Sequence, residues 1–244
     1  MKIDPIHQFN IEPLFTIGQI GKHTIAFTNS SLYMFLTVAV ISLLMIGGMA
    51  GRQLVPGRLQ SIAEISYEFV AGTIRSTAGS EGMKFFPLIF SLFMFILLGN
   101  MIGLIPYTFT FTGQVVVTFA LAIFVFLLVT IVAFIKHGLH FFTFFFPPGA
   151  PKVMAPILVP IEIISYLSRP ISLGIRLFAN MMAGHTMLEV FATFAVVLPW
   201  WGKIAPTGFM VAFTGLEVLV AFLQALIFAV LTCIYLNDAV NMHH

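Results

Sequence analysis

Charged side chains are scarce in this chain of 244 residues, and that scarcity excludes most soluble folds. Only 8% of the residues are charged, whereas 59% are hydrophobic and the mean hydropathy is +1.05. A soluble domain carries roughly 25% charged residues, because its surface has to stay hydrated. The single cysteine, Cys233, excludes a fold built on disulfides, and a net charge of +2 offers no surface for nucleic acid. The composition therefore indicates a polytopic membrane protein.

Stretches without charged side chains predict where the chain crosses the membrane. A helix needs about 20 predominantly apolar residues to span the hydrocarbon core, and Ser31–Gly51 is one such stretch. The charge-free region 85–135 is long enough for two spans, and Pro106 marks the break between them. Beyond a proline-rich loop, Met154–Leu198 and Thr207–Val240 are predicted to form two long helices. Five crossings follow.

The segment between the first span and the hairpin has a different pattern, because its polar and apolar residues separate onto two helical stripes. Glu64, Glu68 and Arg75 share one stripe, which predicts an amphipathic helix lying at the membrane interface. The predicted fold is an all-α polytopic membrane protein with about five membrane helices and one interfacial helix. Its parts are an outer N-terminal segment at 1–30, a first span at 31–51, an interfacial helix at 57–80, a helical hairpin at 85–135 and a long helix pair at 154–240.

The distribution of basic residues orients the crossings. Cytoplasmic loops of membrane proteins carry an excess of lysine and arginine, and placing the N-terminus outside gives that excess. The cytoplasmic set is then Arg52, Arg58, Arg75, Lys84, Lys136 and Lys152, and the outer set is Lys2, Lys22 and Lys203. The polar first thirty residues do not resemble a secretory signal. No internal repeat is visible, so an inverted-repeat transporter has no support in the sequence.

Ionisable and other strongly polar residues within the predicted spans concentrate in the last two helices. Such residues are costly in hydrocarbon, so each is a candidate functional residue. The predicted fifth element, counting the interfacial helix as the second, carries Glu162, Arg169, Arg176, His185 and Glu189, and the sixth carries Glu217 and Gln224. Residues three or four positions apart share a helical face, which puts Glu162, Ser165, Arg169, Ser172, Arg176 and Asn180 on one stripe. His185 follows Arg176 by nine positions and therefore lies on the opposite face.

Structural roles remain open for several of these residues. Glu162 and Glu189 can be charges near helix ends that reach the headgroups, and His185 can be a packing histidine. Arg169 and Lys203 fit a structural or interfacial role better than a mechanistic one. Arg176 differs, because it lies in the middle of its segment and its guanidinium stays protonated at any accessible pH.

The sequence around Arg176 resembles a known family. The run Ser172–His185, SLGIRLFANMMAGH, is similar to the signature of subunit a of the F-type ATP synthase membrane sector. The resemblance extends over about residues 30–240. Its other elements are Pro156, Glu162 and Ser168-Arg169-Pro170 before the signature, Gly99-Asn100 and Pro106-Tyr107 in the hairpin, and Glu217 with Gln224 near the end.

The resemblance implies a stator that offers two offset proton half-channels to a rotating c-subunit ring. It implies that Arg176 faces the ring carboxylate, that His185 and Glu217 line the outer half-channel and that Glu162 lines the inner one. Gln224 and Asn180 would hydrogen-bond near the arginine. The implied partners are the c-ring, b-type peripheral-stalk subunits, the remaining ATP synthase subunits and the lipid bilayer of an inner membrane. The last two helices would be tilted, and the chain would need no cofactor or metal and have no catalytic site of its own.

Three other classes fit the sequence less well. An intramembrane hydrolase lacks its metal or nucleophile motif, and a haem cytochrome lacks a second deep histidine. A secondary ion or proton transporter is the strongest alternative, since it also uses buried charges. One geometric expectation follows from the helix midpoints, because residue 176 and residues 223–224 lie at equal depth. Arg176 and Gln224 are predicted to approach within hydrogen-bond range or through one bridging water.

Overall fold

The computed structural model describes residues 9–20, 23–51, 55–105, 108–138, 141, 145 and 154–240. Several features named above lie outside these residues. They are the predicted break at Pro106, Tyr107 of the family resemblance, most of the loop before Met154, and the basic residues Lys2, Lys22, Arg52 and Lys152. The helices are α1 (Asn29–Met49), α2 (Arg58–Gly82), α3 (Phe86–Gly103), α4 (Val115–His137), α5 (Ala155–Val197) and α6 (Ile204–Val240), with short 3₁₀ turns η2 (Met83–Phe85) and η3 (Phe111–Gly113).

Five helical segments of the described residues are long and apolar enough to cross a membrane. They are α1, the continuous stretch Arg58–Gly103 that contains α2 and α3, α4, α5 and α6. This confirms the predicted all-α polytopic fold. The sequence did not predict the antiparallel hairpin of β1 (Pro13–Ile20) and β2 (His23–Thr28), which precedes α1.

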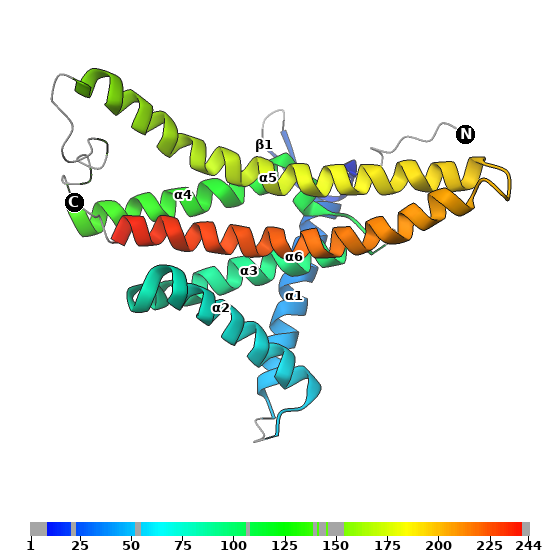
Figure 1. Cartoon of the computed structure of the whole chain (residues 1–244), viewed down its shortest axis with the longest axis horizontal. Coiled ribbons are helices and arrows are strands. Elements are labelled where there is room, and N and C mark those ends of the chain that lie inside the picture. Colours follow the sequence, from blue (N-terminus) through cyan, green and yellow to red (C-terminus); the bar gives the residue numbers. More distant parts are fainter. Residues whose placement is uncertain are drawn as a thin grey trace.

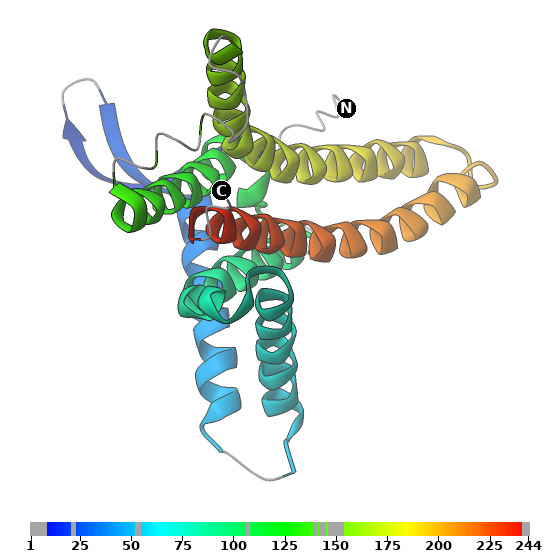
Figure 2. The same cartoon turned by 60° about the vertical axis from the view of Figure 1, so that its left-hand side comes forward.

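The four helices α3 to α6 run roughly along one direction, and α1 crosses them steeply (Figure 1). Helix α2 runs back alongside α1 before the chain turns into α3, as Figure 2 shows. The helical run of α2 is interrupted at Gly79, whose φ of 64° is a left-handed conformation that glycine adopts without strain. The exposed Ile62 and Ile65 point away from the protein, while Val70 and Ile74 on the other face are buried.

Helix α6 is central to the packing, since it contacts α2, α3, α4 and α5. Small residues recur on its buried face at Ala221, Ala225 and Ala229. In a bilayer, small residues of this kind let helices approach closely and gain dispersion contacts. Large apolar side chains remain exposed on α1, α4, α5 and α6, which suits a chain whose surroundings are lipid tails or partner subunits.

Helix α5 contains Pro160 and Pro170 within its 43 residues. A proline inside a helix lacks the N–H that would bond the carbonyl four residues earlier, and it bends the helix. Helix α5 bends part-way along its length and then runs beside α6 to their shared turn (Figure 1).

Candidate functional site

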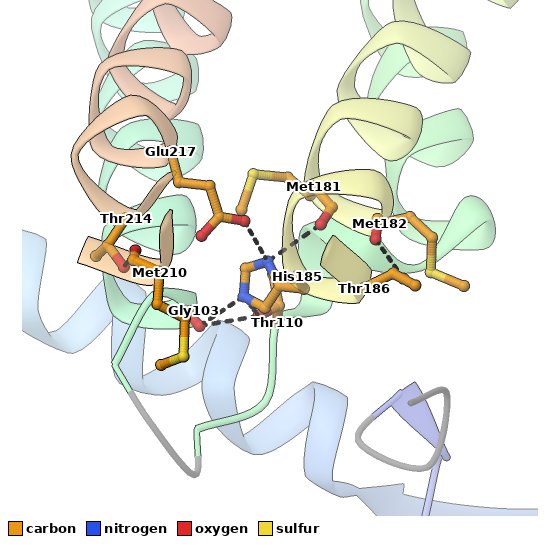
Figure 3. Close-up of polar contacts among 9 residues, drawn as sticks. All are labelled: Gly103, Thr110, Met181, Met182, His185, Thr186, Met210, Thr214 and Glu217. Atoms are coloured by element: carbon orange, nitrogen blue, oxygen red, sulfur yellow. Dashed lines mark hydrogen bonds and ion pairs between the residues drawn. The ribbon is translucent and has the colours of Figure 1, made fainter. Parts of the chain in front are cut away.

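His185 on α5 is the centre of a buried polar cluster near the turn between α3 and α4. Its Nε2 lies 2.9 Å from the carbonyl oxygen of Gly103 and 3.0 Å from Thr110 Oγ1, and its Nδ1 lies 3.1 Å from the carbonyl oxygen of Met181 (Figure 3). Carbonyl oxygens only accept hydrogen bonds, so these contacts need a proton on each ring nitrogen. The surroundings of His185 therefore suit an imidazolium cation.

Glu217 on α6 supplies the matching negative charge. One carboxylate oxygen lies 3.4 Å from His185 Nδ1, and both side chains are less than 10% exposed. No hydrogen bond to either carboxylate oxygen occurs within the described residues. The carboxylate packs directly on α5 at Gly184, where any side-chain carbon would collide with it. Because a buried charge needs a partner, His185 and Glu217 form one electrostatic unit.

A cavity of about 730 Å³ reaches this unit. His185 lies in its wall, and most of its other polar wall residues are far from His185 in the sequence. These polar residues are Asn10, Glu12, Asn29, Tyr33, Thr108, Glu189 and Thr214. A space of this size and polarity holds many water molecules, so it can supply protons to His185.

Arg176 lies two and a half turns before His185 on α5, roughly 13 Å along the helix axis. Its side chain is exposed, and one guanidinium nitrogen lies 3.5 Å from Ser172 Oγ. The neighbouring Ile171 and Ile175 are also exposed. A fixed positive charge thus projects from the exposed surface in the middle of α5, with apolar side chains beside it.

The direct hydrogen bond of Gln224 goes to Asn180 and not to the predicted Arg176. Gln224 is buried on α6, and its Oε1 accepts from Asn180 Nδ2 at 2.8 Å. Within the described residues, no hydrogen bond joins Gln224 to Arg176. The observed pairing lies one helical turn, roughly 6 Å, further along α5 than the helix midpoints predict.

Glu162 occupies the opposite end of α5 from His185. It is half-buried, and it precedes Arg176 by 14 positions, roughly 21 Å along the helix axis. Ser165, one turn later on the predicted stripe, is exposed. The arginine therefore lies between two acid–base groups that are far apart along one helix.

Arg169, for which the sequence favoured a structural or interfacial role, belongs to a contact between α5 and α6. A guanidinium nitrogen lies 3.5 Å from Asp238 Oδ2, and its central carbon lies 5.5 Å and 5.0 Å from the ring centres of Tyr166 and Tyr235. The Tyr166 hydroxyl and Thr130 Oγ1 on α4 are 2.7 Å apart. Two cavities of about 10 Å³, each the size of a single water, adjoin Arg169 and Tyr235.

The structure thus places His185 beside Glu217 and Asn180 beside Gln224. Glu162 and Arg176 belong to neither pair. Sequence reasoning missed Thr110, Glu12 and the carbonyl oxygen of Gly103. Thr110 and Glu12 lie outside the predicted spans, where polar residues are ordinary, and a backbone carbonyl has no signature in sequence.

This fold and this distribution of charges define a polytopic α-helical membrane protein with a buried acid–base pair between α5 and α6. The family model described as ATP synthase A chain matches residues 31–237. Among curated relatives, ATP synthase subunit a of Rhodopseudomonas palustris (strain BisB18) is 63% identical, covering 99% of this chain and all of the relative. The subunits a of Bradyrhizobium diazoefficiens and Nitrobacter winogradskyi are 62% and 60% identical, covering 100% and 99% of this chain and all of each relative. The chain belongs to the ATP synthase A chain family.

Proposed function

We propose that this protein is the stator subunit of the F-type ATP synthase membrane sector and couples proton translocation to ATP synthesis. The observation that carries the proposal is the position of Arg176, an exposed cation in the middle of α5 with His185 and Glu162 on either side along the helix. Two proton paths that end at this arginine from opposite membrane faces would serve a rotating ring of c subunits.

The outer path begins in the cavity next to His185. A proton from cavity water binds the His185–Glu217 unit and replaces one that the unit hands on toward the ring. The 3.4 Å separation of Nδ1 and the Glu217 carboxylate lets the pair hold one proton on either group. Asn180 and Gln224 do not titrate near neutral pH; they join α5 to α6 between this unit and Arg176.

Arg176 acts on the ring carboxylate as a fixed charge. A carboxylate in hydrocarbon stays protonated, because isolated charge is costly there. Beside a guanidinium the same carboxylate ionises, because an opposite charge favours the charged form. The arginine thus promotes proton release at this point of the rotation, and its positive charge opposes a direct proton leak between the two paths.

The inner path runs along the beginning of α5. Glu162 accepts the released proton and passes it to water at the cytoplasmic face. The apolar surface around Arg176, with the exposed Ile171 and Ile175, is suited to pack against the ring's own apolar helices. The ring site then turns through lipid in its neutral form until it meets the outer path.

The same proposal sets the partners and the location. The chain works with the c-ring, b-type peripheral-stalk subunits and the other ATP synthase subunits, as a multi-pass inner-membrane protein with its N-terminus outside. ATP chemistry belongs to partner subunits, and this chain has no catalytic site of its own.

The decisive experiment replaces Arg176 in the complete ATP synthase. We expect Arg176→Ala to abolish proton-driven ATP synthesis in membrane vesicles, because the fixed charge disappears while the exposed position leaves the fold intact. Ser172→Ala is the matched control, since it removes the hydroxyl next to the guanidinium and keeps the charge. Normal synthesis by the Arg176→Ala complex would refute the proposal and favour an independent transporter.

A further inference from the structure

Phe9 lies deep in the protein although it precedes the β-hairpin in an otherwise exposed segment. Its side chain is 7% exposed, whereas Asn10, Ile11 and Glu12 are all exposed. The Phe9 ring approaches His185 edge-on, with ring centres 6.1 Å apart and planes at 62°. An aromatic ring from the N-terminal segment therefore packs against the central histidine of the outer path.

The turn between α3 and α4 is shaped to receive this ring. At Gly113 a side-chain carbon would lie 2.6 Å from the Phe9 ring, closer than such atoms can approach. The next residue, Gln114, donates from Nε2 to the carbonyl oxygen of Phe9 at 2.7 Å. The ring and its own backbone are thus both held by this turn.

The rest of the segment is fixed to the start of α1 through Asn29. Its Nδ2 donates to the carbonyl oxygen of Asn10 at 3.0 Å, and its Oδ1 accepts from the backbone N–H of Glu12 at 3.3 Å. The backbone N–H of Asn29 also donates to the carbonyl oxygen of Glu12 at 3.1 Å. Residues 9–12 therefore have a defined path across the outer side of the site.

Two of these four residues border the cavity that reaches His185. Asn10 and Glu12 line it, together with Glu189 from α5 and Thr214 from α6. The segment has an apolar side, Phe9, against the histidine and a polar side toward the cavity. A wall with this arrangement excludes water from one flank of His185 and leaves the other flank wet.

We propose that residues 9–12 are a wall of the outer proton path and that Phe9 closes one flank of His185, so that protons arrive through the cavity bordered by Glu12 and Glu189. The role as a proton path rests on the proposed function, while the shielding is a property of the structure alone. Phe9 is a positioning residue in this scheme: it acts through His185 by confining solvent access to one side.

Solvent access can be measured with a cysteine in place of the histidine. The assembled ATP synthase carries Cys233→Ser and His185→Cys, and a small membrane-impermeant thiol reagent is added to the outer face. Adding Phe9→Ala should accelerate labelling of position 185 several-fold, because the second flank becomes open to water. Phe15→Ala is the matched control, since Phe15 is 61% exposed and should leave the rate unchanged.

A second substitution tests whether the reagent reaches position 185 through the cavity. Ala192 lines the cavity, so Ala192→Trp should fill it and slow labelling several-fold, whereas Leu43→Trp on the exposed surface of α1 should not. If Phe9→Ala prevents assembly, Gln114→Ala loosens the same wall while keeping the ring, and faster labelling is again expected.

Unchanged labelling in both Phe9→Ala and Gln114→Ala would overturn the shielding role. Equal acceleration by Phe15→Ala would overturn the assignment of the shielding to Phe9. No labelling of position 185 in any variant would overturn the cavity route. Labelling does not need rotation, so these results are independent of the synthesis assay on Arg176→Ala, which tests the proposed function.

Discussion

At the scale of single residues, Glu217 is tightly constrained on the proposed outer path. Its carboxylate is buried, lies against His185 and touches the α5 backbone at Gly184. Removing a partner from a buried charge costs several kcal/mol, because the remaining ion stays uncompensated. The pair is therefore kept together by packing as well as by charge, and the small residue at 184 is part of that arrangement.

Gly184→Ala should disturb this unit severely. The added methyl group would displace the Glu217 carboxylate from His185, so passive proton flux through the membrane sector should fall, and overpacking should cost about 1–3 kcal/mol of stability. Gly215→Ala is the control, because the corresponding position on α6 is open and alanine is the better helix former. Flux equal to wild type in the Gly184→Ala complex would contradict the close contact.

At the scale of elements, α5 and α6 are longer than a perpendicular crossing requires. Helix α5 has 43 residues, about 60 Å at 1.5 Å per residue, whereas the hydrocarbon core is about 30 Å thick. Such a helix has to tilt, and Pro170 gives it a bend. Next to that bend, Arg169 binds Asp238 and stacks on Tyr166 and Tyr235, which fixes α5 to α6 near the end where Glu162 lies.

A double-mutant cycle on Arg169→Gln and Asp238→Asn should measure this attachment. Both side chains keep contact with solvent, so their ion pair should contribute only about 0.2–1 kcal/mol. Arg169→Gln alone should lower the thermal midpoint of the complex more than Asp238→Asn, because it also removes two cation–π contacts. Equal effects of the two single substitutions would mean that the tyrosine rings add nothing.

At the scale of the whole molecule, the all-α class and the number of helices able to cross a membrane could be predicted from the sequence. In a bilayer the polar groups of the backbone have to be hydrogen-bonded within the protein, so a long charge-free stretch forms a membrane-spanning helix. The β-hairpin could not be predicted, because its residues Leu14 and Phe15 are exposed and give no pattern of burial. The pairing of Asn180, rather than Arg176, with Gln224 depends on how α5 and α6 cross, which sequence spacing does not contain.

The proposed orientation can be tested with two cysteines in a Cys233→Ser background. Glu162→Cys should react with an impermeant thiol reagent added to the cytoplasmic face. Thr214→Cys, which lies in the cavity one turn before Glu217, should react from the outer face. Labelling of both positions from one face would refute either the topology or the two-path scheme.

The acceptors around His185 have a consequence for how this site tolerates mutation. Two of its three short contacts go to main-chain oxygens, those of Gly103 and Met181. Substituting Met181 changes a side chain and leaves its carbonyl in place, whereas any side-chain carbon at Gly103 would collide with Thr110. The preference of this position for an imidazole is therefore encoded largely in backbone shape, so a change of the Met181 side chain should disturb the histidine less than a side chain added at Gly103.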